Sequence, residues 1–216
     1  MADSTQIGGG GPVSIAGATT LSGATTISGD LTTTGEHNHS GAATFTGQVK
    51  LQGNSGTAPG TGISGGSGTV CKVSVLREGT LITTKILVDL TGLDSTTTVD
   101  QVIGKAGTDP AFLTKITAAK NGTIIGGFVN VFEAPGTGQT DIDIRANSSA
   151  TLKKGDAGGG TQVMIAGAGL DTGSNSYKVV TGGISADDHL YLSCGAAGTA
   201  GTYDAGKLVI TLFGTV

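Results

Sequence analysis

The segment Leu81-Ile-Thr-Thr-Lys-Ile-Leu-Val-Asp-Leu90 gives the clearest indication of the fold, because half of its residues are β-branched. The segment Val70–Leu76 precedes it with a similar composition, and Gly79 lies between the two. β-Branched residues favour strands, and glycine favours turns. We therefore predict two β-strands in this part of the chain.

Six further segments have the same character and are mostly bounded by Gly, Asn or Asp. They are Thr123–Phe132, Ile142–Ile144, Gln162–Ile165, Tyr177–Val180, His189–Cys194 and Lys207–Phe213. Eight short strands with Gly-rich turns predict a jelly-roll-like β-sandwich over residues 70–216. One short helix is expected at Thr98–Lys105, before Gly107 and Pro110.

The composition of the chain is unusual, with 40 glycines in 216 residues, 37 % hydrophobic residues and 4 % aromatic residues. Globular proteins contain about 7 % glycine and about 45–50 % apolar residues. Disordered chains combine low hydrophobicity with high charge, but only 13 % of these residues are charged. We therefore expect an all-β protein that obtains part of its buried surface from identical neighbours.

The charge balance argues against nucleic acid as a partner. The net charge is −4, and Arg77 and Arg145 are the only arginines, so phosphate contacts would be few. The first residues lack the pattern of a secretory signal, and no run of about 18 apolar residues is present for a membrane span. We expect no membrane partner and a chain that is assembled in the cytoplasm, where it is kept or from which it is released by a route other than secretion, such as cell lysis.

A six-residue repeat occupies the first quarter of the chain, where glycine recurs at every sixth position from Gly11 to Gly53. Mostly apolar columns lie two and four residues before the glycines, and residues two apart on a strand share a face. Hexapeptide periodicity is typical of β-helical or fibre-like folds. We expect three chains to wind about one axis here; a flexible Gly/Thr/Ser linker is the alternative.

These patterns divide the chain into four parts. An N-terminal arm (1–12) is followed by a glycine-hexad β stem (13–53), a Gly/Ser linker (54–69) and the β-sandwich domain (70–216). The fold class is therefore all-β, with a short trimeric β-helical or fibre-like stem.

His37 and His39 fall on the two inward columns of the stem. Three chains would bring six imidazoles to the axis, and six nitrogens suit an octahedral ion. We predict iron or zinc at these histidines, holding the three chains in register. A surface His-x-His pair that binds nothing is the alternative.

The stem resembles those of phage tail fibres and spikes. Gly35-Glu-His37-Asn-His39-Ser-Gly41 is similar to the His-x-His motifs that hold iron on the axis of trimeric fibres. Ile15-Ala-Gly-Ala-Thr-Thr and Leu21-Ser-Gly-Ala-Thr-Thr are similar to their Gly/Thr repeats. The resemblance implies a homotrimer and supports the metal at His37 and His39.

A second resemblance, to structural proteins of marine phages, covers the stretch from Leu87 to Arg145. It is carried by Leu87-Val-Asp-Leu-Thr-Gly-Leu, Asp100-Gln-Val-Ile-Gly, Ile116-Thr-Ala-Ala-Lys-Asn-Gly, Glu133-Ala-Pro-Gly-Thr and Asp141-Ile-Asp-Ile. The resemblance implies a phage virion structural protein on the exterior of the particle.

Two functions follow from these resemblances. In the first, which we favour, the chain is a trimeric capsid decoration (cement) protein that binds the major capsid protein or other virion proteins and stabilises the head. In the second, it is a tail-fibre or spike module for host attachment, with a host-surface glycan as partner. The small number of aromatic residues argues against the second function, because glycan sites use exposed aromatic rings.

We find no residue pattern that predicts catalysis, and no enzyme is expected. His189 follows Asp187-Asp188, which we interpret as a turn entering a strand. Asp141 and Asp143 share a strand face with Arg145, so we expect them to be solvated or paired with it; a calcium site is the alternative.

Cys71 and Cys194 each lie in a predicted strand. We favour two small buried thiols, with a disulfide between them as the alternative.

Overall fold

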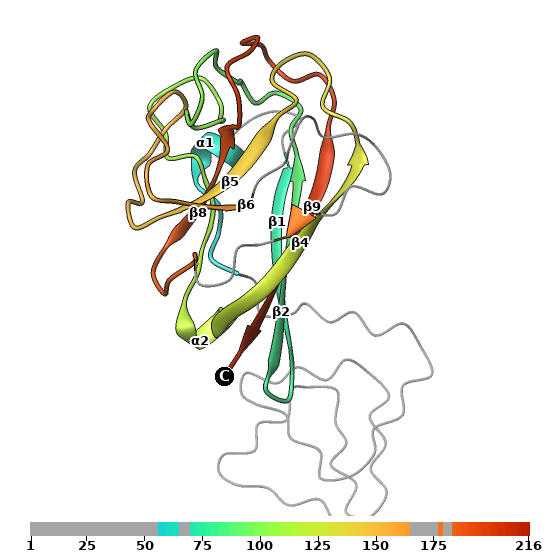
Figure 1. The fold of residues 1–216 in the computed structure, drawn as a ribbon, viewed down its shortest axis with the longest axis vertical. Coiled ribbons are helices and arrows are strands. Elements are labelled where there is room, and N and C mark those ends of the chain that lie inside the picture. The colour runs from blue at the N-terminus through green and yellow to red at the C-terminus, as the bar shows by residue number, and fades with distance from the viewer. Residues whose placement is uncertain (1–55, 65–69, 165–176, 179–182) are drawn as a thin grey trace, which may run out of the picture. The chain divides into compact units, whose positions relative to one another are not determined.

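The computed structural model describes residues 56–64, 70–164, 177–178 and 183–216 (Figure 1). All of them belong to one compact unit, Lys50–Val216. The arm and the stem, with His37 and His39, lie outside the described residues, so the expectations for them remain predictions.

The described part of the chain is all-β, with nine strands and two one-turn helices. The strands are β1 (Val70–Glu78), β2 (Leu81–Asp89), β3 (Phe112–Lys115), β4 (Thr123–Glu133), β5 (Ile142–Asn147), β6 (Thr161–Met164), β7 (Tyr177–Lys178), β8 (His189–Cys194) and β9 (Lys207–Thr215). Each of the eight segments predicted as a strand overlaps one of these strands, and β8 has the predicted bounds. The sequence prediction missed β3.

The helix predicted at Thr98–Lys105 was wrong. The amide of Val102 donates to the carbonyl of Asp156 and that of Ile103 to the carbonyl of Leu192, both at 2.9 Å. Both side chains are fully buried. A segment whose amides bond to distant carbonyls cannot also form a helical ladder, so tertiary contacts override the local preference.

The two observed helices are α1 (Thr61–Ser64) and α2 (Ala118–Asn121). No helix in the described ranges is long and apolar enough to cross a membrane. Helix α2 ends at Gly122, where φ is +65° and an added Cβ would lie 2.5 Å from the carbonyl oxygen of Thr215. Glycine therefore allows β4 to begin directly beside the end of β9.

The strands form two antiparallel sheets, one of five strands in the order β1-β2-β9-β4-β7 and one of four in the order β3-β8-β5-β6. Four pairs are nested along the chain: β2 with β9, β3 with β8, β4 with β7, and β5 with β6. Successive pairs alternate between the two sheets. The chain from β2 onward is therefore arranged as one long folded hairpin that closes between β5 and β6.

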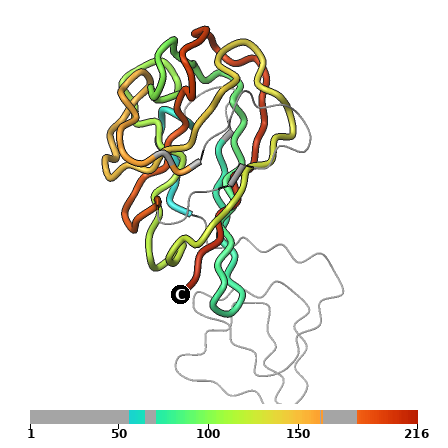
Figure 2. Tube along the Cα trace, in the orientation of Figure 1, coloured from blue at the N-terminus to red at the C-terminus, as the bar shows by residue number. Residues whose placement is uncertain are grey.

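Strand β1 is added at the edge of the five-stranded sheet by pairing with β2. Figure 2 shows the hairpin of these two strands extending beyond the other described strands. Leu76 and Leu81, near its tip, are 50 % and 40 % exposed. The hairpin therefore presents apolar side chains to solvent at its far end.

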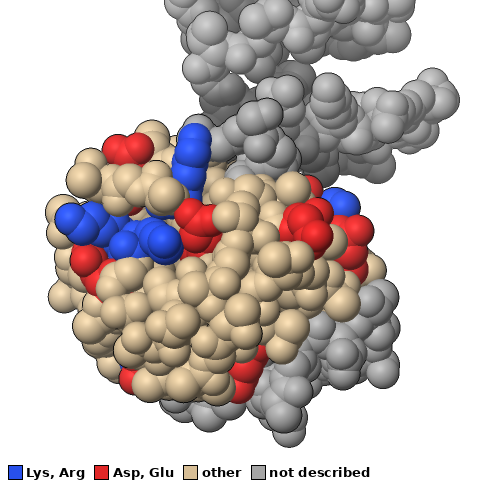
Figure 3. Space-filling model, turned by 90° about the horizontal axis from the view of Figure 1, so that it is seen from above, with Lys and Arg blue, Asp and Glu red and all other residues tan. Residues whose placement is uncertain are grey.

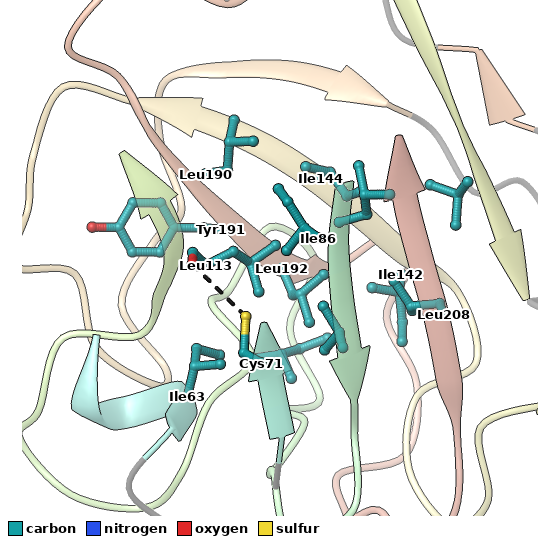
Figure 4. Packing of buried hydrophobic residues seen from close by; sticks show 14 of the residues in the cluster. Ile63, Cys71, Ile86, Leu113, Ile142, Ile144, Leu190, Tyr191, Leu192 and Leu208 are labelled. Carbon is teal, nitrogen blue, oxygen red and sulfur yellow. Dashed lines mark hydrogen bonds between the residues drawn. The ribbon is translucent and has the colours of Figure 1, made fainter. Parts of the chain in front are cut away.

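Residues from both sheets form one hydrophobic cluster (Figure 4). Ile86, Leu192 and Leu208 are among its fully or almost fully buried members. Cys71 and Cys194 are buried and free, so the disulfide alternative was wrong. The thiol of Cys71 contacts the carbonyl of Leu113 at 3.8 Å, and burial raises its pKa to about 12.

Residues 56–64 lie within the segment expected to be a linker, yet they contact the domain closely. The amide of Gly60 donates to the carbonyl of Phe112 at 2.9 Å, and that of Gly62 to the carbonyl of Pro110 at 2.8 Å. Ile63 is fully buried in the hydrophobic cluster. This stretch is therefore held against β3 and the residues before it.

Candidate functional site

The outer face of the five-stranded sheet carries an unusual set of side chains. Along β2, Ile82, Thr84, Ile86 and Val88 are buried, so the residues between them point away from the core. The strand register places Thr83 opposite Phe213, Lys85 opposite Thr211 and Leu87 opposite Val209. Across the next pair of strands, Phe128 lies opposite Thr211 and Asn130 opposite Val209. Strands β2, β9 and β4 therefore contribute to one continuous surface.

A groove of about 530 Å³ runs over this surface. It is lined by Thr83, Lys85, Phe128, Asn130, Phe132, Val209, Thr211 and Phe213.

Aromatic rings dominate the apolar part of the groove. Phe128, Phe132 and Phe213 are three of the five phenylalanines of the whole chain. The rings of Phe128 and Phe213 are tilted against one another with 5.8 Å between their centroids. Phe132 is 59 % exposed, the largest value among the exposed large hydrophobic residues of the described part. Rings of this size are normally placed in the core, so their position at a groove indicates a binding surface.

Polar groups lie between the rings. The side-chain oxygen of Asn130 is buried and has no hydrogen-bond partner within the described structure. Lys85 is exposed and takes part in none of the ion pairs of the described residues. Thr83 and Thr211 add hydroxyl groups. The groove therefore offers unpaired hydrogen-bonding groups beside apolar rings.

Gly126 leaves open space next to this groove. It lies opposite Phe213 in the register of β4 and β9, and a Cβ built on it would meet no atom within 4 Å. Its φ is not in the left-handed region, so other residues fit its backbone. A side chain introduced at this position would point beside the ring of Phe213.

The outer face of the four-stranded sheet is different, because loops cover it. Arg145, which lies opposite Tyr191, has its guanidinium bonded to the carboxylate of Asp100 and, at 3.3 Å, to the carbonyl of Gly159. The hydroxyl of Tyr191 donates to the carbonyl of Ser149 at 2.7 Å. Burial raises the pKa of this phenol to about 12. These groups hold the loops on the sheet.

The ion pair found for Arg145 is with Asp100, whereas the sequence had predicted Asp141 and Asp143 to be solvated or paired with this arginine. Asp143 is 2 % exposed and therefore not solvated. Partial burial raises the pKa of Asp141. Within the described residues, no group of three or more His, Cys, Asp or Glu side chains could hold a metal ion.

His189 begins β8 after a turn in which Asp187 has a φ of +73°, as the sequence predicted. Its ring packs edge-on against Phe112 with 5.0 Å between centroids. Burial lowers its pKa. Asp187 pairs with Lys115 at 2.6 Å. We interpret His189 as a packing residue of the covered face.

Charges of both signs lie side by side on the end of the molecule seen in Figure 3. Lys154 and Asp94 are 4.0 Å apart, at the border of an ion pair. They line a shallow depression of about 250 Å³ together with Ser95 and Thr202. The charge at this depression is therefore mixed.

Sequence reasoning did not find the groove, although one signal was present. In Phe128-Val-Asn-Val-Phe132, one strand face carries Phe128 and Phe132 and the other carries two valines, so both faces have apolar residues. Such a pattern indicates a strand with two buried faces or with one face reserved for a partner. This pattern was not recognised because the run is short and because the strands were predicted from their content of β-branched residues.

Comparison with known proteins returned no match: no family model fits the chain, no curated protein is similar to it, and no solved structure is similar to its fold.

Proposed function

We propose that this chain is a non-enzymatic phage virion structural protein whose described domain is a jelly-roll-like β-sandwich. The nesting of β2 with β9, β3 with β8, β4 with β7 and β5 with β6 supports this fold. A jelly roll is a long hairpin whose strand pairs alternate between two sheets, and it is frequent among viral capsid and lectin domains. This nested pairing is the observation that carries the proposal.

The stem completes the proposed architecture. Residues 13–53 would join three chains through their glycine-hexad columns, with iron or zinc at His37 and His39 on the axis. The low content of bulky residues supports association with identical chains, because a single chain would leave the apolar columns of the stem exposed to solvent.

Within the virion, we propose the role of a trimeric capsid decoration (cement) protein on the particle exterior. A trimer that binds only the assembled shell stabilises it by mass action. Its partners would be its own copies and the major capsid protein. The compactness of the unit that contains the described residues supports this role, since a compact unit can be repeated over a shell.

The number of copies per particle tests this role. Quantitative mass spectrometry of purified particles should give a ratio to the major capsid protein near that of a shell component. A ratio typical of a tail structure, with at most a few tens of copies per particle, would contradict decoration.

A tail-fibre or spike module for host attachment is the second candidate, and one observation favours it. The exposed rings of the groove provide the aromatic surface that the composition had made improbable for a glycan site. Electron microscopy with an antibody against the chain separates the two roles, because it labels either the whole head or only the tail.

The stem is tested separately with the full-length chain. Sedimentation equilibrium should give the mass of three chains, and metal analysis should give one iron or zinc per trimer. Replacing both His37 and His39 with Ala should remove the metal. Metal content that does not change in this variant, or that is zero in the native trimer, would contradict the axial site.

A further inference from the structure

We propose that the groove over β2, β9 and β4 binds an acidic oligosaccharide, a chain of sugar rings that carries carboxylate or sulfate groups. The inference concerns a binding site and holds for either virion role. It starts from the combination of three phenylalanine rings with polar side chains on one open sheet face.

The mixture of side chains favours a sugar over a protein partner. The core of a protein interface is depleted in lysine and is more apolar than its rim. Here Lys85, Thr83 and Thr211 lie among the rings of the groove. A sugar ring has an apolar C–H face that packs on the negative face of an aromatic ring, and its hydroxyl groups lie around the edge. An alternation of rings and polar groups matches that distribution.

Asn130 supports a polar ligand. Its side-chain oxygen is buried without a partner in the described structure, and its amide belongs to the groove lining. An unsatisfied buried polar group costs free energy, and a rotation of the Asn130 side chain that brings this oxygen to a donor of the ligand would remove the cost. Sugar hydroxyl groups are donors of the right kind.

Lys85 determines the charge of the ligand. The chain has a net charge of −4, yet the charged residue of the groove lining is this lysine. The nearby Lys207 at the end of β9 pairs with Glu133 at 2.7 Å. Lys85 and Lys72, which lies opposite Leu87 on the same face, take part in none of the ion pairs of the described residues, and of these two only Lys85 lines the groove. Charge complementarity therefore favours a carboxylate or sulfate over Lys85.

The size and shape of the groove fit a short stretch of a polymer. Its volume of about 530 Å³ lies within the range of ligand sites. It is an open groove on a sheet face, with Phe132 more than half exposed at its border. An open groove accepts an internal stretch of a longer chain.

Titration of the full-length protein with three hexasaccharides of equal length tests the inference. The probes are hexagalacturonate, a sulfated carrageenan hexasaccharide and neutral maltohexaose, with binding followed by calorimetry. We expect one of the two acidic probes to bind and maltohexaose to bind more weakly, by up to about fivefold, as for loss of one exposed ion pair. Added salt should weaken binding of the acidic probe.

Variants locate the site. Phe132→Ala should weaken binding at least about tenfold, as truncation of an aromatic anchor does, whereas Phe132→Tyr should retain it. Lys85→Gln should remove the preference for acidic probes, and Lys85→Arg should restore it. Gly126→Glu should weaken binding and Gly126→Lys should strengthen it. Val99→Ala, at an exposed hydrophobic residue outside the groove lining, is the matched control and should change nothing.

Three results would overturn the inference. They are failure of all three probes to bind, equal binding of the neutral probe, and loss of the oligomer in Phe132→Ala. The last result would assign the groove to contact between copies of the chain. Copy number on particles tests the virion role and is independent of all of these results.

Discussion

The outer faces of the two sheets of this domain differ in both composition and exposure to solvent. The outer face of the four-stranded sheet is polar and covered, with Arg145, Asp143 and Ser193 each at most 9 % exposed. The outer face of the five-stranded sheet carries aromatic rings and forms an open groove. The positions of the loops therefore determine which outer face is exposed to solvent. Side-chain polarity alone would predict an exposed polar face and a buried aromatic face.

The covered face shows how loops bury polar residues, although Arg145 Nε, His189 Nδ1 and Ser193 Oγ remain without a hydrogen-bond partner in the described structure. Its groups bond to loop atoms: Arg145 to Asp100, Asn147 to the carbonyl of Gly158 at 2.8 Å, and Tyr191 to the carbonyl of Ser149. Buried polar groups are tolerated when they are hydrogen-bonded. The open face lacks such loops within the described residues, so its rings are available to a ligand.

The largest expected effect compares one aromatic residue from each outer face. Tyr191→Ala should lower the free energy of unfolding by about 3–5 kcal/mol, because Tyr191 is fully buried and the change creates a cavity. Phe132→Ala should change it by less than about 0.5 kcal/mol, as for an exposed site. Urea denaturation measures both. Similar losses for the two variants would show that the open face is part of the folded core.

The next effect concerns the ion pair that holds a loop on the covered face. Arg145→Met should cost about 1–3 kcal/mol, since the guanidinium is largely buried and bonds to both Asp100 and Gly159. The matched change Lys207→Met, in the exposed pair with Glu133, should lower the free energy of unfolding much less. A double-mutant cycle with Asp100→Asn isolates the interaction free energy between Arg145 and Asp100. A value near zero would mean that Arg145 stabilises the fold by packing alone.

A smaller change in the free energy of unfolding, of opposite sign, is expected for a substitution in the groove. Asn130→Val should raise the free energy of unfolding by about 0.5–1 kcal/mol, because it removes an unpaired buried oxygen from a strand. The same variant should bind acidic hexasaccharide more weakly. A destabilised variant would indicate that Asn130 has a structural partner.

The smallest effect is a pH dependence from His189. Burial holds its pKa below the ordinary value of 6.5, so near that pH the unfolded state binds more protons than the folded state. Its contribution to stability is full above pH 6.5 and is lost as the pH falls toward the lower pKa of the folded state. Unfolding measured from pH 7.5 to 5.5 should show this decrease. His189→Leu should flatten it, and an unchanged slope would assign the dependence to other groups.

Strands were predictable from the sequence because their signal is local. Runs such as Leu81–Leu90 contain β-branched residues and end near glycine, and each of these features acts within a few residues. Strand β3 was missed because Phe112–Lys115 contains only one β-branched residue and follows Pro110. Thr98–Lys105 was wrongly predicted as a helix because its backbone bonds to residues far along the chain.

The groove and the pairing of Arg145 could not be predicted from local patterns. The groove requires the register of β2, β9 and β4, whose residues lie up to 130 positions apart, from Thr83 to Phe213. Arg145 has two carboxylates nearby in the sequence and pairs with Asp100, which is 45 residues away.

The sequence by itself determined the all-β class and the positions of eight strands, because strand preference and turn chemistry depend on near neighbours along the chain. The tertiary structure alone decided the nested strand order, which sheet face the loops cover, and which aromatic rings remain at a groove. These features depend on contacts between residues distant in sequence, and side-chain type alone does not specify them.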